Sequence, residues 1–159
     1  MQIIRNREII EDDFVHVPDG AELPASGKPI VTLARYTAAR EELLKRYPAL
    51  GVRITCDKLP SDIPDVARLA LVAIEFPRFT EGRGYSIARL LRQRHKFTGE
   101  LRAVGWVLRD QLYYMSRCGF TAFELKPGKP LESALEAFGE FSGTYQSAVD
   151  DPRPIYRRR

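Results

Sequence analysis

The sequence predicts an α/β fold, with a mostly parallel sheet of about five strands and helices on both faces, a flavodoxin-like sandwich. Strand-like and helix-like stretches alternate about five times between residues 29 and 145, which is too few for a closed eightfold barrel. The strongest strand, "LALVAIEF" at residues 69–76, has no polar residue before Glu75. A strand buried on both faces of a sheet has this composition.

The first 28 residues are expected to form a short N-terminal β-hairpin and a linker. The opening "QIIRNREIIEDDFVHV" predicts two short strands around a polar turn, and the proline- and glycine-rich "PDGAELPASGKP" that follows is typical of a connection. The stretch "PIVTLARY" then begins the α/β domain, residues 29–145. Thr37 is the expected N-cap of the first helix, which Pro48 and Gly51 end.

The remaining elements follow the same alternation. A strand "GVRITC" and a turn-rich link precede the strongest strand. After it we expect, in order, a helix from about Ser86 to His95, a strand "ELRAVGWV", a helix from about Arg109 to Cys118, a strand "FTAFEL" and a helix from Leu131 to about Phe141. Residues 146–159, which end in three arginines, are expected to be a basic tail.

The composition of the chain excludes some classes of function but does not identify one. The chain has 159 residues, 44% of them hydrophobic, and a formal net charge of +4, so it is mildly basic. Such a balance suits nucleic acid, acidic proteins or small anions, but no nucleic-acid-binding motif occurs, so nucleic acid is not an expected partner. Two cysteines exclude a disulfide framework and a cysteine zinc motif. Without a signal-like or membrane-length apolar run, we expect a cytoplasmic protein with no membrane partner.

The stretch "EFPRFTEGRGYSIARLLRQR", residues 75–94, carries the strongest hint of a site. It follows the carboxyl end of the most buried strand, where ligands collect in parallel sheets. Two glycines would let a ligand approach the backbone, and the start of the next helix would favour an anion. Arginines flank the turn and continue along one stripe of the helix. The predicted ligand-binding residues are Arg78, Gly82, Arg83, Gly84, Tyr85, Ser86, Arg89 and Arg92.

The same stretch also fits a second interpretation, a tight turn followed by a solvated or protein-docking helix. A dinucleotide fingerprint would need a third glycine at position 87, which is Ile87, and no P-loop lysine follows. We therefore expect no cofactor. The residues leave open whether this loop binds a small anion, docks a partner protein or serves the fold alone.

Other candidates for chemistry are few. Glu81 and Asp110 are the candidates for proton transfer if the protein is an enzyme. Together with Glu75 they lie near the carboxyl edge of the sheet, but they lack a metal-binding spacing, so no metal is expected. Cys118 lies at a helix C-terminus, which raises the pKa of a thiol, whereas Cys56 could be more reactive.

The segments "FPRFTEGRGYSIARLLR" and "FTGELRAVGWVLRDQLYYMSRCGFTAFEL" resemble the bacterial domain-of-unknown-function family 934, over about Leu69 to Leu125. The positions that match the family pattern include Arg78, Phe79, Gly82, Arg83, Gly84, Tyr85, Ser86, Arg89, Arg92, Arg102, Asp110 and Gln111. The family pattern has aspartate where this chain has Glu81, Trp106 and Thr121. If those aspartates form a metal or acid–base site, that site is altered here.

The resemblance implies a role in sulfur metabolism. Genes of such proteins lie beside those for sulfite reductase, and the members are described as oxidoreductases of sulfite reduction without demonstrated chemistry. The resemblance therefore favours an accessory protein of assimilatory sulfite or sulfate reduction, which binds sulfite reductase, another protein of the pathway or a small anion. The alternative is a small oxidoreductase or transferase that acts on a sulfur oxyanion or nucleotide.

Overall fold

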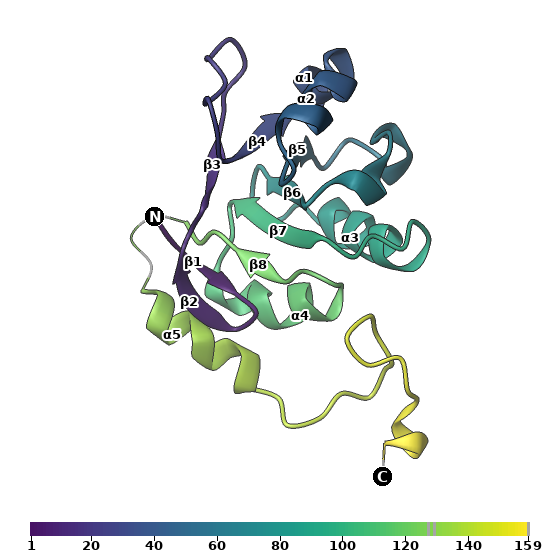
Figure 1. Ribbon diagram of the computed structural model, residues 1–159. Coiled ribbons are helices and arrows are strands. Elements are labelled where there is room, and N and C mark those ends of the chain that lie inside the picture. The colour runs from purple at the N-terminus through teal and green to yellow at the C-terminus, as the bar shows by residue number, and fades with distance from the viewer. Residues whose placement is uncertain (127, 129, 159) are drawn as a thin grey trace.

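The protein is built around one large sheet. The computed structural model describes residues 1–126, 128 and 130–158 (Figure 1). In this part of the chain, eight strands form one sheet in the order β2-β1-β8-β7-β6-β5-β4-β3. The strands are β1 (Gln2–Arg5), β2 (Glu8–Glu11), β3 (Phe14–His16), β4 (Lys28–Thr32), β5 (Gly51–Thr55), β6 (Leu71–Phe76), β7 (Glu100–Gly105) and β8 (Ala122–Phe123). Strands β3 to β8 run parallel to one another, whereas β1 is antiparallel to both β2 and β8.

Helices follow most of the parallel strands. They are α1 (Leu33–Ala38), α2 (Arg40–Arg46), α3 (Arg83–Gln93), α4 (Leu112–Arg117) and α5 (Leu131–Glu136). Short 3₁₀ turns complete the connections at η1 (Pro60–Asp62), η2 (Val66–Arg68), η3 (Arg109–Gln111), η4 (Ala137–Gly139) and η5 (Ile155–Arg157). The predicted cap of the first helix was wrong. The strand β4 runs directly into α1, so its last residue, Thr32, accepts the capping hydrogen bond from the backbone N of Arg35, at 3.3 Å.

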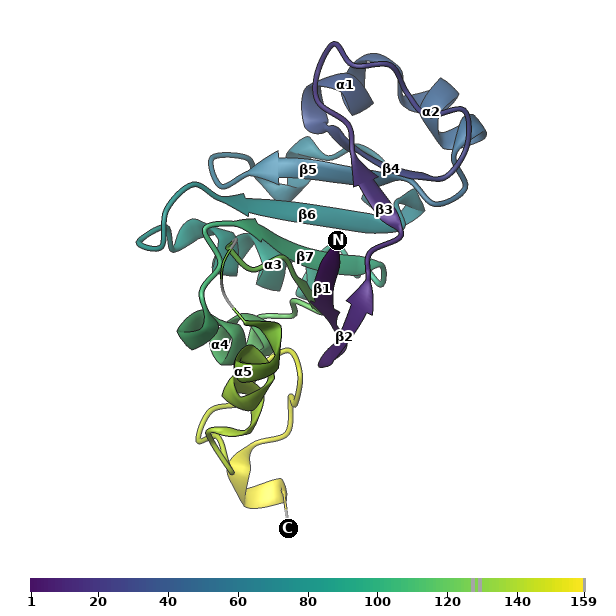
Figure 2. The same cartoon turned by 90° about the vertical axis from the view of Figure 1, so that its left-hand side faces the viewer.

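The sheet curls until its two edges approach each other. Strands β2 and β3 lie at opposite edges, yet only Asp12 and Asp13 connect them. The three Cα–Cα steps from Glu11 to Phe14 span at most about 11 Å. A flat sheet of eight strands would hold its edge strands about 34 Å apart. The short connection therefore requires a curled sheet, and Figure 2 shows β1, β2 and β3 together on one side of the molecule.

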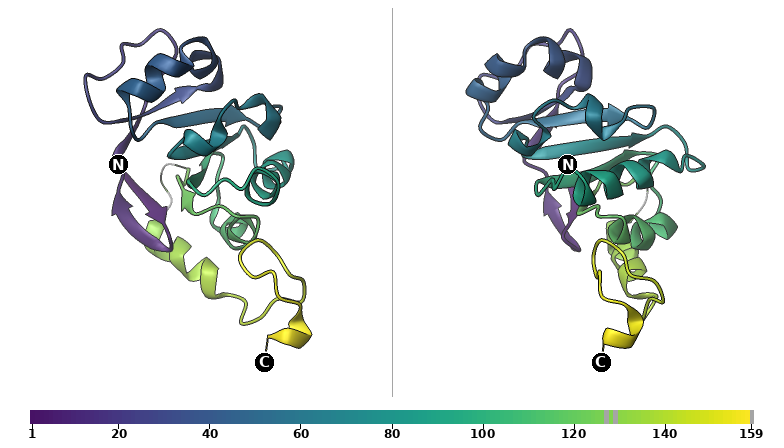
Figure 3. Two further views of the ribbon diagram at one scale, coloured as in Figure 1. Left: turned by 45° about the vertical axis from the view of Figure 1, so that its right-hand side comes forward. Right: turned by 90° about the vertical axis from the view of Figure 1, so that its right-hand side faces the viewer.

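The helices cover only one face of this sheet (Figure 3). Buried side chains from α1 to α5 belong to one hydrophobic cluster, which also contains alternate residues of the strands, among them Val52, Val72, Ile74 and Leu101. The prediction of helices on both faces was therefore wrong. Strands β3 to β8 follow one another across the sheet without a reversal of order. Right-handed crossovers then all lie on the same side, whereas a doubly wound sandwich needs a reversal.

The expected number of strands was also too small. The hairpin of β1 and β2 is confirmed, with Asn6 and Arg7 both at positive φ (52° and 66°). This two-residue turn suits the twist of a hairpin. The hairpin joins the main sheet through β8, and Phe14–His16 forms a further parallel strand beside β4. These short strands carry weak periodicity, and their pairing depends on residues far away in the chain.

The face opposite the helices holds a small apolar cluster and a buried arginine. The cluster consists of Ile30, Leu71, Ala73 and Val104, with Phe14 packed against it. The side chain of Arg102, on β7, is fully buried. Its Nη1 and Nη2 donate to the two carboxylate oxygens of Asp12, at 2.7 and 2.9 Å. This contact ties the connection between β2 and β3 to the middle of the sheet.

Two further carboxylates complete the surroundings of Arg102. Its Nε donates to Glu100 Oε1 at 2.7 Å, and its Nη1 donates to Glu124 Oε1 at 2.8 Å. Arg5 Nε lies 2.7 Å from the second oxygen of Glu100, and His16 Nε2 lies 2.9 Å from Glu124 Oε1. Burial opposes the charge of Arg102, but the three carboxylates outweigh burial and raise its pKa. Burial likewise works against ionisation of Glu124, but its hydrogen bonds from His16 and Arg102 leave its pKa lowered.

Replacement of the buried arginine tests this network. We expect Arg102→Met to lower the free energy of unfolding by about 3–5 kcal/mol, because it leaves three carboxylates without their shared counter-charge. As a control, Arg94→Met removes an exposed arginine and should change the free energy of unfolding by no more than about 0.5 kcal/mol. Urea unfolding followed by circular dichroism measures both. A loss below about 1 kcal/mol for Arg102→Met would show that the network does not hold the curl.

Candidate functional site

The predicted ligand loop lies where the sequence places it, between β6 and α3 at the carboxyl end of the sheet. Helix α3 begins at Arg83, three residues earlier than expected. The side chain of Gln111, in η3, joins this loop to the one that follows β7. Its Nε2 donates to the carbonyl of Phe79 at 3.1 Å, while its Oε1 accepts from the backbone N of Leu108 at 3.0 Å. The two loops therefore form one connected surface.

The start of α3 is occupied by a carboxylate of the protein itself. Glu81 Oε1 accepts hydrogen bonds from the backbone N and from Nε of Arg83, at 3.0 and 2.8 Å. Its Oε2 accepts from Arg83 Nη2 at 2.7 Å. These hydrogen bonds lower the pKa of Glu81 to about 2. Glu81 thus fills the place that an external anion would take at the helix start.

The two glycines of the loop have different surroundings. A Cβ added at Gly84 would lie 2.5 and 2.7 Å from ring atoms of Phe76, whose side chain is fully buried. A Cβ added at Gly82 would meet nothing within 4 Å. Gly84 therefore lets α3 pack closely against β6 inside the core. Only Gly82 faces open space.

Arg92 is part of the framework of the fold. Its Nε donates to the carbonyl of Gly119 at 3.0 Å, and its Nη1 donates to the carbonyls of Phe97 and Gly99, at 2.7 and 2.8 Å. Burial lowers the pKa of this guanidinium. Arg92 thereby fixes the turn after α3 and the end of α4. Its side chain therefore binds backbone carbonyls that follow α3 and α4 and does not serve the predicted ligand loop.

The other predicted binding residues lie on the outside. Arg78, Ser86 and Arg89 are exposed, and Arg89 Nε donates to Gln93 Oε1 at 3.2 Å. Tyr85 is half-buried, with its ring 5.5 Å from Phe76 and 5.4 Å from Tyr114 between centroids. Burial raises the pKa of Tyr85 to about 12.

A group of cationic and aromatic side chains, all exposed except the half-buried Tyr85, therefore remains at this edge. We name it the Arg–aromatic surface: Arg78, Phe79, Tyr85, Arg89 and Tyr114. Phe79 and Tyr114 are 59% and 60% exposed, unusually high for large aromatic side chains. Tyr114 lies one helical turn beyond Gln111, which holds the loop of Phe79. Sequence reasoning did not include Phe79 and Tyr114 in the site, because an aromatic residue on a helix or after a strand usually packs in the core.

The candidates for acid–base chemistry do not come together. Glu75 lies 3.7 Å from Nε of Arg53, Glu81 binds Arg83, and Asp110 is exposed at the start of η3. No group of three or more His, Cys, Asp or Glu side chains is placed to hold a metal ion in the part of the chain that the structure describes.

Neither cysteine is activated as a thiolate. Cys56, which by its sequence position could be the more reactive, is buried and donates to the carbonyl of Glu75 at 3.1 Å. Burial raises its pKa to about 11, which opposes that possibility. Burial also raises the pKa of Cys118. Thiol nucleophiles need the opposite shift.

Comparison with known proteins identifies the family. The family described as "Bacterial protein of unknown function (DUF934)" matches residues 51–156 of the chain. The chain belongs to this family. The searches of curated proteins and of solved structures gave no match. No helix in the described residues has the length and apolar character needed to cross a bilayer.

The matched segment of this DUF934 protein includes α3, the loop before it and the C-terminal segment, but not β1 to β4. Two positions at which the sequence departs from the expected aspartates have ordinary structural surroundings. Trp106 is 38% exposed, with Lys126 Nζ 3.2 Å from the centre of its ring. Thr121 Oγ1 accepts from the backbone N of Leu101 at 3.2 Å. Both side chains therefore make contacts that need no carboxylate.

The two glycines provide a matched pair of substitutions. We expect Gly84→Ala to lower the free energy of unfolding by about 1–3 kcal/mol, because the added methyl group would overlap the buried ring of Phe76. Gly82→Ala should change it by no more than about 1 kcal/mol, since its Cβ enters open space. Thermal and urea unfolding measure both. Equal effects at the two positions would contradict the packing role of Gly84.

The Glu81–Arg83 pair predicts a specific pH dependence. The folded state holds the pKa of Glu81 at about 2, below its ordinary 4.5. Ionised Glu81 therefore stabilises the fold above pH 4.5, and this contribution is lost as the pH falls toward 2. We expect Glu81→Gln to be less stable than the parent protein at pH 7, with a difference that shrinks between pH 4.5 and 2. The exposed Glu22→Gln is the control; a pH-independent difference for Glu81→Gln would refute this account.

Proposed function

We propose that this DUF934 protein is an accessory protein of assimilatory sulfite reduction that binds a protein partner through the Arg–aromatic surface. Membership of the family supports the assignment to sulfite reduction, through the resemblance described above. Arg78 and Phe79 are exposed, and Gln111 holds their loop through the backbone carbonyl of Phe79. These features support the assignment of the surface.

The composition of the surface carries the proposal. Arginine and tyrosine dominate the binding energy of protein interfaces, and they do so best when the free protein already holds them in position. Here Gln111 fixes the loop of Phe79, and Tyr85 packs against both Phe76 and Tyr114. In the described part of the chain, neither Arg78 nor Arg89 forms an ion pair. A partner that presents carboxylates would supply the missing counter-charges.

The contacts of Glu81 favour a protein partner over a small anion. A sulfate-sized ligand at the start of α3 would have to displace the carboxylate of Glu81 from Arg83 and from the helix backbone. A partner protein can instead contact Arg78, Phe79 and Tyr114 from outside and leave that pair intact.

The ion pair between Glu81 and Arg83 also disfavours the alternative function, an oxidoreductase or transferase in which Glu81 transfers protons. A general acid or base works best with a pKa near the working pH. With a pKa of about 2, Glu81 stays ionised near neutrality and is a weak base. Calorimetric titration with sulfite, sulfate and adenosine phosphosulfate tests this alternative, and binding of any of these with turnover would replace our proposal.

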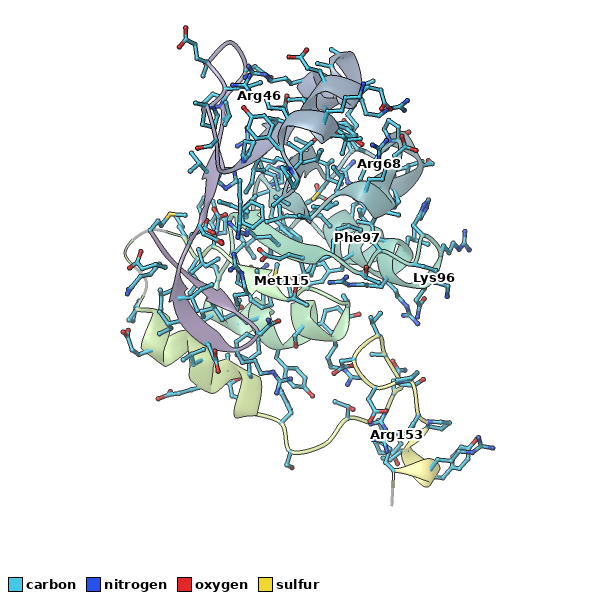
Figure 4. All side chains as sticks on the ribbon, viewed as in Figure 1. Arg46, Arg68, Lys96, Phe97, Met115 and Arg153 are labelled. Atoms are coloured by element: carbon cyan, nitrogen blue, oxygen red, sulfur yellow. The ribbon has the colours of Figure 1, made fainter. Side chains whose placement is uncertain are left out.

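The docking proposal is tested with purified sulfite reductase. We expect the parent protein to bind it, and Arg78→Glu combined with Phe79→Ala to weaken binding by at least about tenfold, since both side chains lie in the proposed interface. Lys45→Glu makes the same change of charge on α2, which is not part of the Arg–aromatic surface. Figure 4 shows its neighbour Arg46 at one end of the molecule, far from Lys96, which follows α3. Lys45→Glu should bind like the parent protein.

Surface plasmon resonance at several salt concentrations measures these affinities, and binding should weaken as salt rises. Absence of binding to sulfite reductase at micromolar concentrations would reject this partner. Equal loss of binding in Lys45→Glu would reject the assigned surface.

A further inference from the structure

A pocket of about 330 Å³ lies between α3, α4 and the C-terminal segment, and the residues of the loop before α3 are not part of its lining. Its lining includes Arg89, Tyr113, Tyr114, Arg117, Phe141 and Tyr145. The segment that follows α5 turns back toward α4 (Figures 1 and 3), and its residues 141 and 143–148 line one wall of the pocket. We name this space the tyrosine pocket.

The wall formed by the C-terminal segment is held by Arg117. The Nη1 of Arg117, which is buried, donates to Thr144 Oγ1 at 2.9 Å and to Asp150 at 3.3 Å, and its Nη2 donates to the carbonyl of Gln146. The backbone N of Val149 donates to the carbonyl of Arg117 at 3.1 Å. These contacts make the pocket a built feature of the fold, and they use the charge of Arg117 internally.

The lining is positively charged and rich in aromatic rings. None of the residues that line the pocket is Asp or Glu. Arg117 is paired with Asp150, whereas Arg89 gives only its Nε to Gln93 and has no carboxylate partner within the described chain. The rings of Tyr113 and Phe141 lie 4.8 Å apart between centroids, and Phe141 and Tyr145 are 60% and 87% exposed. Exposed aromatic rings and a guanidinium without a carboxylate partner suit a ligand that combines a flat ring with a separate, negatively charged group.

We propose that the tyrosine pocket binds a nucleoside monophosphate. Its base would stack against Phe141 and Tyr145, and its phosphate would meet the guanidinium of Arg89. Small-molecule sites range from about 300 to 1,000 Å³, and a pocket of about 330 Å³ is of a size for one nucleotide. This inference does not rest on the docking proposal: the docking test alters Arg78 and Phe79, which lie outside the pocket.

Isothermal titration calorimetry with adenosine 5′-monophosphate, adenosine and inorganic phosphate tests the proposal. We expect the monophosphate to bind at least about tenfold more tightly than adenosine or phosphate, because only it uses both parts of the site. Arg89→Gln should reduce its affinity to that of adenosine and leave the binding of adenosine unchanged. Tyr145→Ala should weaken both ligands by about fivefold or more, through loss of stacking.

Arg94→Gln is the matched control, since it removes an exposed arginine near the end of the same helix and outside the pocket. It should bind the monophosphate like the parent protein. Circular dichroism and thermal unfolding should show that each variant keeps the fold. No binding of the monophosphate at millimolar concentration, or equal affinity in the parent protein and Arg89→Gln, would overturn the proposal.

Discussion

The ion pair between Arg102 and Asp12 ties the connection between the two edge strands to the middle of the curled sheet. Asp12 lies in the two-residue connection between the edge strands, and Arg102 lies on β7 near the middle. Burial of a guanidinium inside the curl is favourable only with several carboxylates around it, and Glu100 and Glu124 complete that set. All five helices pack on the face opposite this network, because the parallel strands follow one another across the sheet without a reversal of order. The Arg–aromatic surface lies on α3, on α4 and on the loop before α3.

Arginines do different work at each level of the structure. Arg102 balances buried carboxylates, Arg92 and Arg117 hold loops through backbone carbonyls, and Arg83 binds Glu81 at the start of α3. Each of these guanidiniums already has hydrogen-bond or ion-pair partners within the protein. Arg78 and Arg89 remain at the surface beside exposed aromatic rings, and the proposals for a protein partner and for a nucleotide depend on that difference.

Part of the candidate site could be predicted from the sequence. The end of a buried strand, followed by two glycines and a basic helix, correctly indicated a loop at the carboxyl edge of the sheet. Arg78 and Arg89 are exposed there, and their role in binding stays a prediction. The roles of Gly84 and Arg92 could not be predicted. A glycine that accommodates a buried ring has the same local sequence as a glycine that accommodates a ligand. An arginine that binds carbonyls likewise has the same local sequence as one that faces solvent.

The sequence by itself determined the class of the fold, the parallel core of the sheet and the family, because alternating periodicity and motif spacing are local properties of the chain. Only the tertiary structure decided that the sheet curls, that the helices share one face and which charges are paired. Asp12 and Arg102 are 90 residues apart, and Arg117 and Asp150 are 33 apart. Partners so distant along the chain are brought together by the path of the whole chain, which no local pattern encodes.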